Sequence, residues 1–288
     1  MGSSSNHASN EGRRQRPIAR TRFIGREEEL RRLTQLVPDE RLVTLLGVGG
    51  VGKTRLILEA IPRVRERFAG GVEVVELAGL TDPDLLLVAI AAAVGVRASS
   101  TGDLVDAFQE RFEEPTLVVL DNFERILTAG ASLSQLLDVC PRLHIVVTSR
   151  AALRLTRERE FVIGPLAIPP ERWERADLEP TLSIDSVALF IDRARARGLE
   201  VPLADDDLSA VVEICRRLGG WPLAAWYLAF DAVTRARRGA REAARASRAG
   251  QASRRPALNF DRRRSRCSAA PPDDRRHGRL ERRASCSE

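Results

Sequence analysis

The sequence predicts an α/β protein, a three-layer sandwich built on a parallel sheet, with a small helical domain after it. Three observations predict this class. Short apolar runs alternate with helical apolar spacing over the first 168 residues, which is the pattern of a parallel sheet covered by helices on both faces. A glycine-rich turn joins the first strand signal to the first helix signal, and only helical patterns follow Pro169 and Pro170.

The first strand and helix flank the glycine-rich turn. Residues 41–47 (RLVTLLG) indicate a buried strand, and residues 53–68 carry apolar side chains at helical spacing. Pro62 is expected to kink or stop that helix, because proline lacks the backbone N–H that a helix interior needs. The order is therefore strand, glycine loop, helix.

Four more strands are expected, with helices between them. A strand at 72–77 precedes a helix that starts at Thr81, Asp82 and Pro83 and runs through Ala93. The remaining signals predict, in chain order, a helix at 103–112, a strand at 116–120, a helix at 133–139 and strands at 144–148 and 161–163.

The chain divides into four predicted parts. Residues 1–20 are polar and aperiodic and are expected to form a disordered lead, and residues 21–168 contain the sheet. Residues 169–230 form the small helical domain, in which amphipathic or apolar patterns predict helices at 186–197, 207–218 and 221–229. Residues 231–288 hold only four sizeable apolar side chains and are predicted to be a disordered, arginine-rich tail.

Charge is distributed unevenly along the chain. A net charge of +6 and a pI near 10 are typical of a protein with a nucleic-acid partner. However, residues 231–288 carry 17 arginines and 7 acids, a net +10, which leaves 29 basic and 33 acidic groups, a net −4, for residues 1–230. The tail lacks the interleaved aromatic side chains of a nucleic-acid reader, so no specific reader is indicated.

Several classes are excluded by composition. No run approaches the roughly 18 apolar residues of a membrane span, and the amino terminus lacks the apolar centre of a secretory signal. No membrane association is expected, and a cytoplasmic location follows. The four cysteines (Cys140, Cys215, Cys267 and Cys286) lack paired short spacing, so neither a metal site nor a disulfide framework is indicated.

The glycine-rich turn carries the strongest motif. Gly47-Val-Gly-Gly-Val-Gly-Lys53-Thr54 matches G-x-x-x-x-G-K-[ST] and lies between a strand and a helix, as a P-loop must. The sandwich is therefore predicted to be a P-loop NTPase domain that binds a purine nucleotide, ATP or ADP with Mg²⁺. Successive backbone N–H groups should face the phosphates. The expected cofactor-binding residues here are Gly47, Gly49, Gly50, Val51, Gly52, Lys53, Thr54 and Arg55.

Two of these residues have particular roles. Lys53 should contact the β- and γ-phosphates, and it is the only lysine in a chain that otherwise uses arginine. Thr54 should place its hydroxyl on Mg²⁺. Asp121, which ends the apolar run Leu117–Leu120, has the form of a Walker B acid and is the second expected metal residue.

Two further residues are candidate catalytic groups. Asn122 occupies the position after the Walker B acid, where many ATPases carry a general base, and Asn cannot accept the proton. Glu124 is the nearby substitute, although it could equally be a solvated acid that opens a helix. Arg150 ends the strand signal Val146-Val-Thr-Ser149 and could meet the γ-phosphate. Catalytic roles are thus expected for Lys53, Asp121, Glu124 and Arg150.

Five motifs in order resemble one family. Phe23-Ile-Gly-Arg-Glu27, GVGGVGKTRL, LVVLDNFE, VVTSR and Gly219-Gly-Trp-Pro-Leu-Ala224 look like the STAND class of P-loop NTPases, in particular the NB-ARC-like module of large bacterial transcriptional regulators of the LuxR or SARP type. The resemblance covers residues 21–230. It implies that Gly25 and Arg26 lie against the base and ribose, that Arg150 is a sensor arginine and that Pro222 packs on adenine. The helical domain would correspond to the ARC1 part.

The resemblance also implies parts that this sequence does not show. The family's next parts would be a winged-helix domain and sensor repeats, but after Leu228 the apolar periodicity gives way to arginine, alanine and serine. A truncated, frameshifted product and a genuine basic tail both account for this pattern.

Two functional classes compete. The first is a signalling switch, closed with ADP, opened by ATP and reset by slow hydrolysis, with self-association through the NTPase domain as an option. The second is an AAA+ motor or loader that needs an arginine finger from a neighbouring subunit. A non-hydrolysing nucleotide-binding module is a further alternative. The G-x-P motif at Gly220–Pro222 favours the switch.

Overall fold

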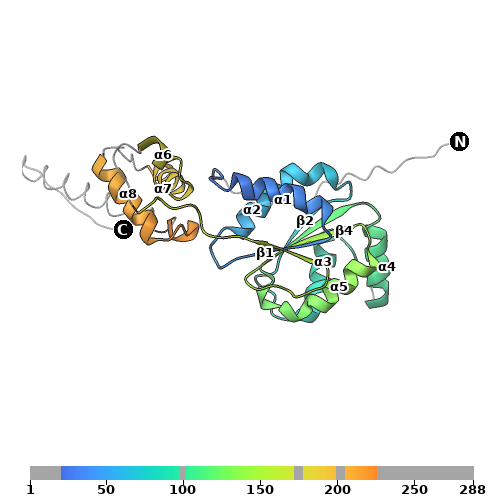
Figure 1. The fold of residues 1–288 in the computed structure, drawn as a ribbon. Coiled ribbons are helices and arrows are strands. Elements are labelled where there is room, and N and C mark those ends of the chain that lie inside the picture. Colours follow the sequence, from blue (N-terminus) through green and yellow to red (C-terminus); the bar gives the residue numbers. More distant parts are fainter. Residues whose placement is uncertain (1–20, 98–100, 172–177, 199–204, 226, 228–288) are drawn as a thin grey trace, which may run out of the picture. The chain divides into compact units, whose positions relative to one another are not determined.

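The computed structural model describes residues 21–97, 101–171, 178–198, 205–225 and 227 (Figure 1). The chain divides into two units, Met1–Gly239 and Ala240–Glu288, and every described residue falls in the first. The predicted lead at 1–20 and the predicted tail at 231–288 lie outside the described residues, so both remain predictions.

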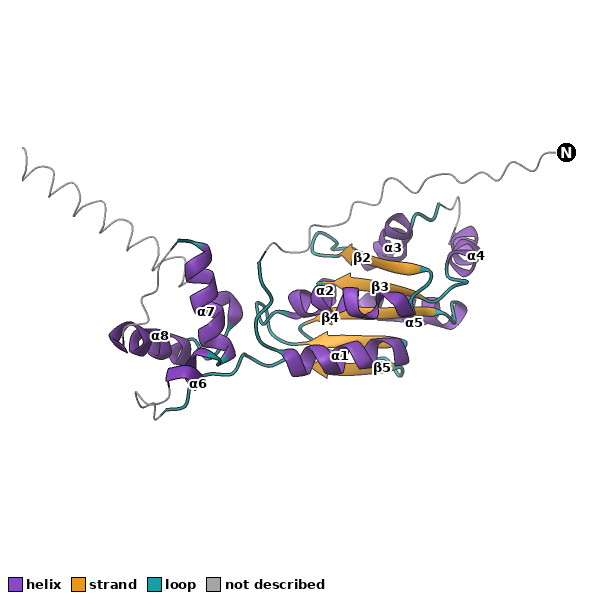
Figure 2. Ribbon diagram, turned by 90° about the horizontal axis from the view of Figure 1, so that it is seen from above, coloured by secondary structure: helices purple, strands orange, loops and turns teal. Residues whose placement is uncertain are grey.

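A five-stranded sheet forms the centre of the sandwich, and every strand pair in it is parallel. The strands are adjacent in the order β2-β3-β4-β1-β5 (Figure 2). Their bounds are β1 Leu42–Leu46, β2 Gly71–Glu76, β3 Thr116–Asp121, β4 Leu143–Ser149 and β5 Glu158–Val162. All five predicted strands are therefore present, with β5 beginning three residues before its predicted start.

Helices cover both faces of the sheet, with α1 and α2 above it and α3, α4 and α5 below it in Figure 1. Because side chains alternate along a strand, Val43 of β1 packs with α1 and α2, whereas Leu42 packs with α3, α4 and α5. The predicted three-layer α/β sandwich is confirmed. The helices are α1 Glu27–Asp39, α2 Lys53–Val64, α3 Leu86–Val94, α4 Thr101–Arg111 and α5 Gly130–Val139.

Helix α1 is the main element that the sequence reasoning missed. Its apolar residues Leu30, Leu33 and Val37 are spaced for one helix face, and all three are buried against the sheet. The predicted helix at 53–68 ends earlier, because α2 stops at Val64 and a 3₁₀ turn continues to Arg67. Pro62 lies inside the last turn of α2 and thus acts as a stop rather than as a mid-helix kink.

The helical part begins after residue 171. It contains α6 (Leu178–Leu182), α7 (Asp185–Ala196) and α8 (Asp205–Arg217), of which α6 was not predicted. Residues 222–225 and 227 are also helical, and the rest of the helix predicted at 221–229 lies outside the described residues. Side chains of α7 and α8 share a small core of Val187, Phe190, Ile191, Leu208, Val211, Val212 and Cys215.

The connector after β5 joins the two parts. The backbone N–H of Leu166 donates to the carbonyl of Gly220 at 2.9 Å, and the N–H of Ser186 donates to the carbonyl of Ala167 at 3.3 Å. Leu166 also packs with Leu189 and Ile24. Residues from the amino-terminal segment, the connector and α7 thus meet. Among the described residues no helix combines the length and the apolar character that a membrane crossing requires.

Candidate functional site

The loop after β1 has the backbone geometry of a phosphate cradle. Gly50 and Gly52 take positive φ angles of 79° and 102°, which glycine adopts without the steric cost that a Cβ imposes. The backbone N–H of Gly47 donates to the carbonyl of Ser149 on the adjacent strand at 3.3 Å. Gly52 is the N-cap of α2. The loop therefore curls at the amino terminus of a helix, where anions are stabilised.

Lys53 is held inside this loop. Its side chain is buried, and Nζ donates to the carbonyls of Gly47 at 2.7 Å and Val48 at 3.3 Å. Burial lowers the pKa of Lys53 below its ordinary value, whereas the nearby Glu124 raises it and Arg150 lowers it. The ammonium is thus fixed at the loop by the carbonyls of Gly47 and Val48.

Asp121 lies at the end of β3 and is 3% exposed. Its Oδ1 accepts hydrogen bonds from the hydroxyls of Thr54 and Thr148, both at 2.6 Å, and its Oδ2 accepts from Nδ2 of Asn122 at 3.3 Å. These contacts join the ends of β3 and β4 to the first turn of α2. The sequence placed Asp121 and Thr54 together, but it gave no indication of Thr148.

The pair of Thr54 and Asp121 fits Mg²⁺. A hydroxyl and a carboxylate oxygen within hydrogen-bonding distance are the hard oxygen donors that Mg²⁺ takes, usually with one or two carboxylates and the phosphates of its nucleotide. No group of three or more His, Cys, Asp or Glu side chains able to hold a metal occurs among the described residues. A magnesium ion held jointly with a nucleotide is consistent with this arrangement.

Glu124 and Arg150 form an ion pair beside the loop. The Nε of Arg150 lies 2.9 Å from Oε1 of Glu124, whose side chain is 19% exposed. Glu124 lies in a 3₁₀ turn, Phe123–Arg125, rather than at the start of a longer helix. Glu124 thus lies in the first turn of a short 3₁₀ helix, but its carboxylate is mostly buried and paired rather than solvated.

The opposite end of the site is built around Arg26. Its guanidinium donates through one nitrogen to the carbonyls of Val51 at 2.9 Å and Gly164 at 2.7 Å, and it pairs with Glu29 at 3.4 Å. Burial lowers its pKa from the ordinary value, although Glu29 and Asp185 raise it. In the structure the guanidinium thus holds the P-loop and the connector, while Arg26 also lines the pocket.

Gly25 and Arg26 also contact the helical part. Both have positive φ angles, and the N–H of Arg26 donates to Oδ2 of Asp185, the first residue of α7, at 3.2 Å. A Cβ on Gly25 would overlap the Asp185 carboxyl group. Only glycine fits here without displacing that carboxyl group.

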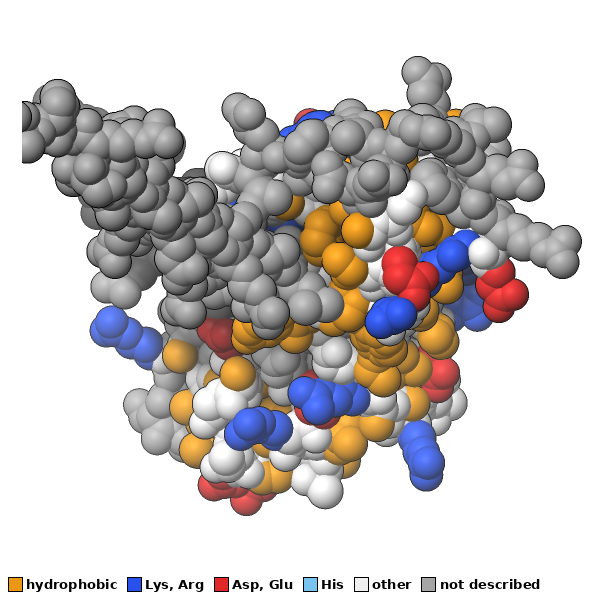
Figure 3. Space-filling view, turned by 90° about the vertical axis from the view of Figure 1, so that its left-hand side faces the viewer, with side chains coloured by type: hydrophobic (Ala, Val, Ile, Leu, Met, Phe, Trp, Pro, Cys, Tyr) orange, Lys and Arg blue, Asp and Glu red, His pale blue; other side chains and the backbone are white. Residues whose placement is uncertain are grey.

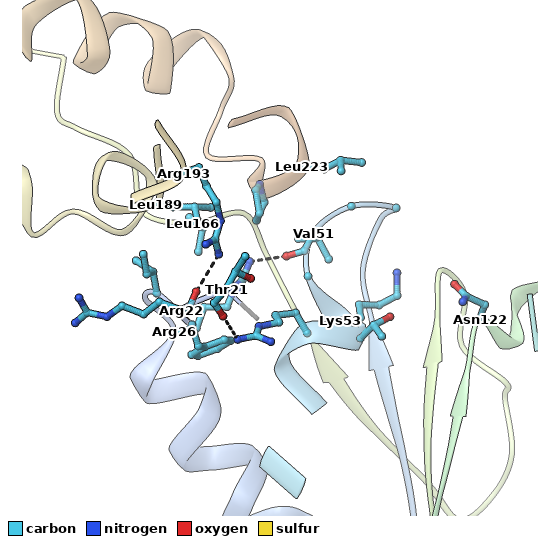
Figure 4. Close-up of a pocket in the computed structure, with 18 of the residues that line it drawn as sticks. Thr21, Arg22, Arg26, Val51, Lys53, Asn122, Leu166, Leu189, Arg193 and Leu223 are labelled. Atoms are coloured by element: carbon cyan, nitrogen blue, oxygen red, sulfur yellow. Dashed lines mark hydrogen bonds between the residues drawn. The ribbon is translucent and has the colours of Figure 1, made fainter. Parts of the chain in front are cut away.

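A pocket of about 520 Å³ lies between these two ends (Figure 4). In Figure 4, Thr21, Arg22, Arg26 and Arg193 gather on one side, with Lys53 and Asn122 on the other. The volume is in the range of small-molecule sites. Of the residues predicted from the sequence, the pocket is lined by Arg26, Gly49, Gly50, Val51, Gly52, Lys53, Thr54, Arg55, Glu124, Arg150 and Pro222.

Three predicted residues are not in that lining. Gly47 and Asp121 lie just behind it, in contact with Lys53 and Thr54, and Gly25 lines a separate pocket of about 370 Å³ beside Asp185. The sequence reasoning missed five lining residues that come from segments without a nucleotide motif. They are Thr21, Arg22, Leu166, Leu189 and Arg193. Leu223, which also lines the pocket, lies in the Gly219–Ala224 motif but was not predicted as a site residue.

Side chains outside the pocket show no strong charge segregation on the face drawn in Figure 3. The described basic side chains there are interspersed with acidic and hydrophobic ones. This distribution differs from the clustered arginines and lysines that mark a nucleic-acid surface.

The part of the chain that contains the sheet is similar to a known family. Residues 22–148 match the family model described as AAA ATPase domain. The structure of a Walker-type ATPase of Pyrococcus abyssi has a TM-score of 0.48 at 16% sequence identity, covering 80% of this chain and 75% of that one. Residues 22–148 are thus similar in sequence to AAA ATPase domains, and the parallel sheet with its glycine-rich loop has the α/β P-loop NTPase fold.

Two relatives come from Mycobacterium tuberculosis. An uncharacterized protein is 35% identical over 206 residues, which are 71% of this chain and 49% of that protein. A protein provisionally named an HTH-type transcriptional regulator is 36% identical over 192 residues, which are 66% of this chain and 20% of that protein. The chain therefore spans about half the length of the first relative and a fifth of the second.

Proposed function

We propose that the AAA-type ATPase domain of this chain is an ATP- and ADP-binding signalling switch with slow hydrolysis, part of a STAND-type transcriptional regulator. The NB-ARC-like motifs support this assignment, and so does the 36% identity to a relative provisionally named a transcriptional regulator. The chain spans only a fifth of that relative. We therefore propose transcriptional regulation as a role of the whole STAND-type regulator and not of this chain alone.

One observation supports the switch above all others. The pocket has walls from the sheet edge, at Gly49 to Arg55, and from the helical part, at Leu189, Arg193, Pro222 and Leu223. A Cβ on Gly50 would lie 2.8 Å from Cβ of Leu223, so the P-loop and the G-x-P segment are in close contact. A nucleotide that touches both walls has a different affinity for each arrangement of the two parts, and it therefore shifts their equilibrium.

At the phosphate end the roles follow from the contacts. Lys53 offers its ammonium to the β- and γ-phosphates, and the curled backbone from Gly47 to Gly52 offers N–H groups. Thr54 and Asp121 would hold Mg²⁺, which neutralises charge developing on the phosphates. Glu124 is the candidate base that accepts a proton from the attacking water, and Arg150 is the candidate γ-phosphate contact.

At the base end we assign the residues that would surround the base and ribose, without assigning individual hydrogen bonds to them. Arg26, Arg55 and Pro222 all line the pocket. The guanidinium of Arg55 donates to the carbonyl of Thr21 at 2.8 Å and lies over the ring of Phe23. Gly25 contributes indirectly, because it allows the positive-φ turn that precedes α1 and contains Arg26. These residues would enclose the base and ribose, with Pro222 against adenine.

The test is to replace Asp121 with Asn. Asp121→Asn should abolish turnover of Mg-ATP but leave nucleotide binding measurable, because the carboxylate acts on the metal and not on the base. Turnover is measured as phosphate release, and binding as the heat of titration with ADP. Asp138→Asn, which removes an exposed carboxylate paired with Arg157 at 2.9 Å, is the matched control. Equal turnover in wild type and Asp121→Asn would contradict the assignment, and no turnover in the wild type would favour the non-hydrolysing alternative.

A further inference from the structure

The Glu124–Arg150 ion pair brings together two candidate site residues that the sequence treated separately. Glu124 follows β3 and Arg150 follows β4, and these strands are neighbours in the sheet. Their side chains differ in exposure, at 19% for Glu124 and 64% for Arg150. The acid is thus enclosed, whereas the arginine lies largely in solvent.

Glu124 is fixed in place by the backbone that carries it. Asn122 adopts a positive φ of 66°, and its N–H donates to the hydroxyl of Thr148 at 3.0 Å. The following residue, Phe123, is fully buried in the core beneath the sheet. Ile126, after Glu124, is fully buried as well. Anchored residues thus lie on both sides of Glu124, so the exposed Arg150 is the partner that moves when the pair changes.

Arg150 also lies directly over the P-loop. A Cβ placed on Gly49 would be 3.1 Å from a terminal nitrogen of the Arg150 guanidinium. Gly49 belongs to the segment whose backbone N–H groups cradle phosphates in a P-loop. The same guanidinium is therefore within reach of two anions, the Glu124 carboxylate and the terminal phosphate of a nucleotide.

The carboxylate itself is incompletely satisfied. Oε2 of Glu124 is buried and has no hydrogen-bond partner. Buried polar atoms are nearly always paired, so an unpaired one needs an explanation, and a ligand or water in the adjoining pocket is the usual one. Glu124 lines that pocket together with Arg150 and Lys53.

We propose that Glu124 competes with the γ-phosphate for Arg150 and so shifts the preference of the site from ATP towards ADP. The inference rests on the proposed nucleotide function. ADP has no γ-phosphate and leaves the ion pair intact, whereas ATP gains the Arg150 contact only when the pair breaks. Glu124 therefore lowers the affinity for ATP relative to ADP, and departure of Arg150 frees the carboxylate for the attacking water.

Glu124→Ala tests the proposal through binding alone. The expected effect is a roughly two- to fivefold gain in affinity for a hydrolysis-resistant ATP analogue, the size that an ion pair with a largely exposed arginine contributes, with unchanged affinity for ADP. Glu124→Gln keeps the side-chain shape and should show the same direction. Glu114→Ala is the matched control, because Glu114 forms an exposed pair with Arg142 at 3.9 Å and does not line the pocket.

Arg150→Ala completes a double-mutant cycle. This variant should lose affinity for the ATP analogue and keep its affinity for ADP. In the Arg150→Ala background, Glu124→Ala should no longer raise the affinity for the analogue, because no arginine remains to be released. Melting temperatures of the four proteins establish that each is folded before its affinities are compared.

The outcomes distinguish failure of the competition at Arg150 from failure of the proposed nucleotide-binding function. An unchanged ratio of ATP to ADP affinity in Glu124→Ala would overturn the competition. If both affinities rise equally, Glu124 acts by general charge repulsion and not through Arg150. A rise that persists without Arg150 would overturn it too. If the wild type binds neither nucleotide, the proposed function itself fails.

Discussion

The two ends of the pocket differ in how their residues come together. At the phosphate end, Lys53, Thr54 and Asp121 are joined by hydrogen bonds of 2.6 to 2.7 Å to each other or to the loop. They come from motifs at the ends of β1 and β3, the two strands that flank β4 in the sheet. At the base end, Arg26 contacts carbonyls 25 and 138 residues away in sequence. The first end follows from local motifs, whereas the second depends on long-range packing.

The difference has a mechanical consequence. The phosphate end belongs to one sheet edge and should keep its geometry when the helical part moves. The base end includes the contact of Arg26 with Asp185 and the contact of Arg193 with the carbonyl of Arg22 at 2.9 Å, so it exists only while the helical part is in place. Changes at the two ends should therefore have separable effects.

Gly25→Ala should have the largest effect on stability. The new Cβ meets the Asp185 carboxyl group and sits at a φ of 72°, so the substitution adds backbone strain and breaks the bond from the Arg26 N–H. Strain of this kind and the lost bond together cost about 2–3 kcal/mol of unfolding free energy. Denaturant unfolding measures it.

Gly95→Ala is the control for that experiment. Gly95 has a similar φ of 78°, and nothing lies within 4 Å of a Cβ built on it. Gly95→Ala should therefore lose only the unfolding free energy that backbone strain costs, on the order of 1 kcal/mol. Equal losses in the two variants would mean that the Gly25 turn does not hold the helical part through Asp185.

Thr148→Val should weaken the phosphate end and leave the base end intact. Valine has the shape of threonine, but it neither donates to Asp121 nor accepts from the Asn122 N–H. We expect a loss of about 1–2 kcal/mol of unfolding free energy and a several-fold fall in turnover, with ADP affinity preserved. Thr148→Ser should restore both. Wild-type turnover in Thr148→Val would show that Asp121 needs no support from β4.

Asp185→Asn should have a small effect that depends on pH. Burial raises the pKa of Asp185 above its ordinary 3.8, the Arg26 N–H lowers it, and Glu27 and Glu29 raise it. Between 3.8 and the raised value the folded chain binds more protons than the unfolded chain, so this group's contribution to stability falls as pH rises through that window. The asparagine amide does not titrate in this range, so Asp185→Asn lacks this contribution to the pH dependence of stability.

Melting temperatures of the wild type and Asp185→Asn, measured from pH 3.5 to 7, test this sign. The variant should gain stability relative to the wild type as pH increases. Parallel profiles would indicate that the Asp185 carboxyl group titrates in the folded chain as it does in the unfolded one.

The sequence predicted the sheet and the phosphate end because both depend on local patterns. Buried parallel strands are apolar runs, and the P-loop motif specifies its own turn. Helix α1 carried an equally clear signal, with Leu30, Leu33 and Val37 on one face and Glu27 to Glu29 in its first turn. It was missed because only the motif at its start, Phe23–Glu27, was considered, and not the apolar spacing of the residues that follow.

The rest of the site could not be predicted in the same way. Thr148 lies in an apolar strand, and only the pairing of β3 with β4 places its hydroxyl on Asp121. Arg26 was expected at the base and ribose, but its guanidinium donates to the carbonyls of Val51 and Gly164. These contacts join residues 25 to 138 positions apart, and the local sequence around either partner carries no signature of them.

Titration of Mg-ATP into the wild type and Lys53→Ala tests the central claim most directly. Removing the ammonium deletes a charge-assisted contact of about 1.5–3 kcal/mol, so affinity should fall at least tenfold. Arg63→Ala, which removes an exposed cation from the same helix, should bind like the wild type. Equal ATP affinity in Lys53→Ala and the wild type would contradict the assignment of this loop as the phosphate-binding site.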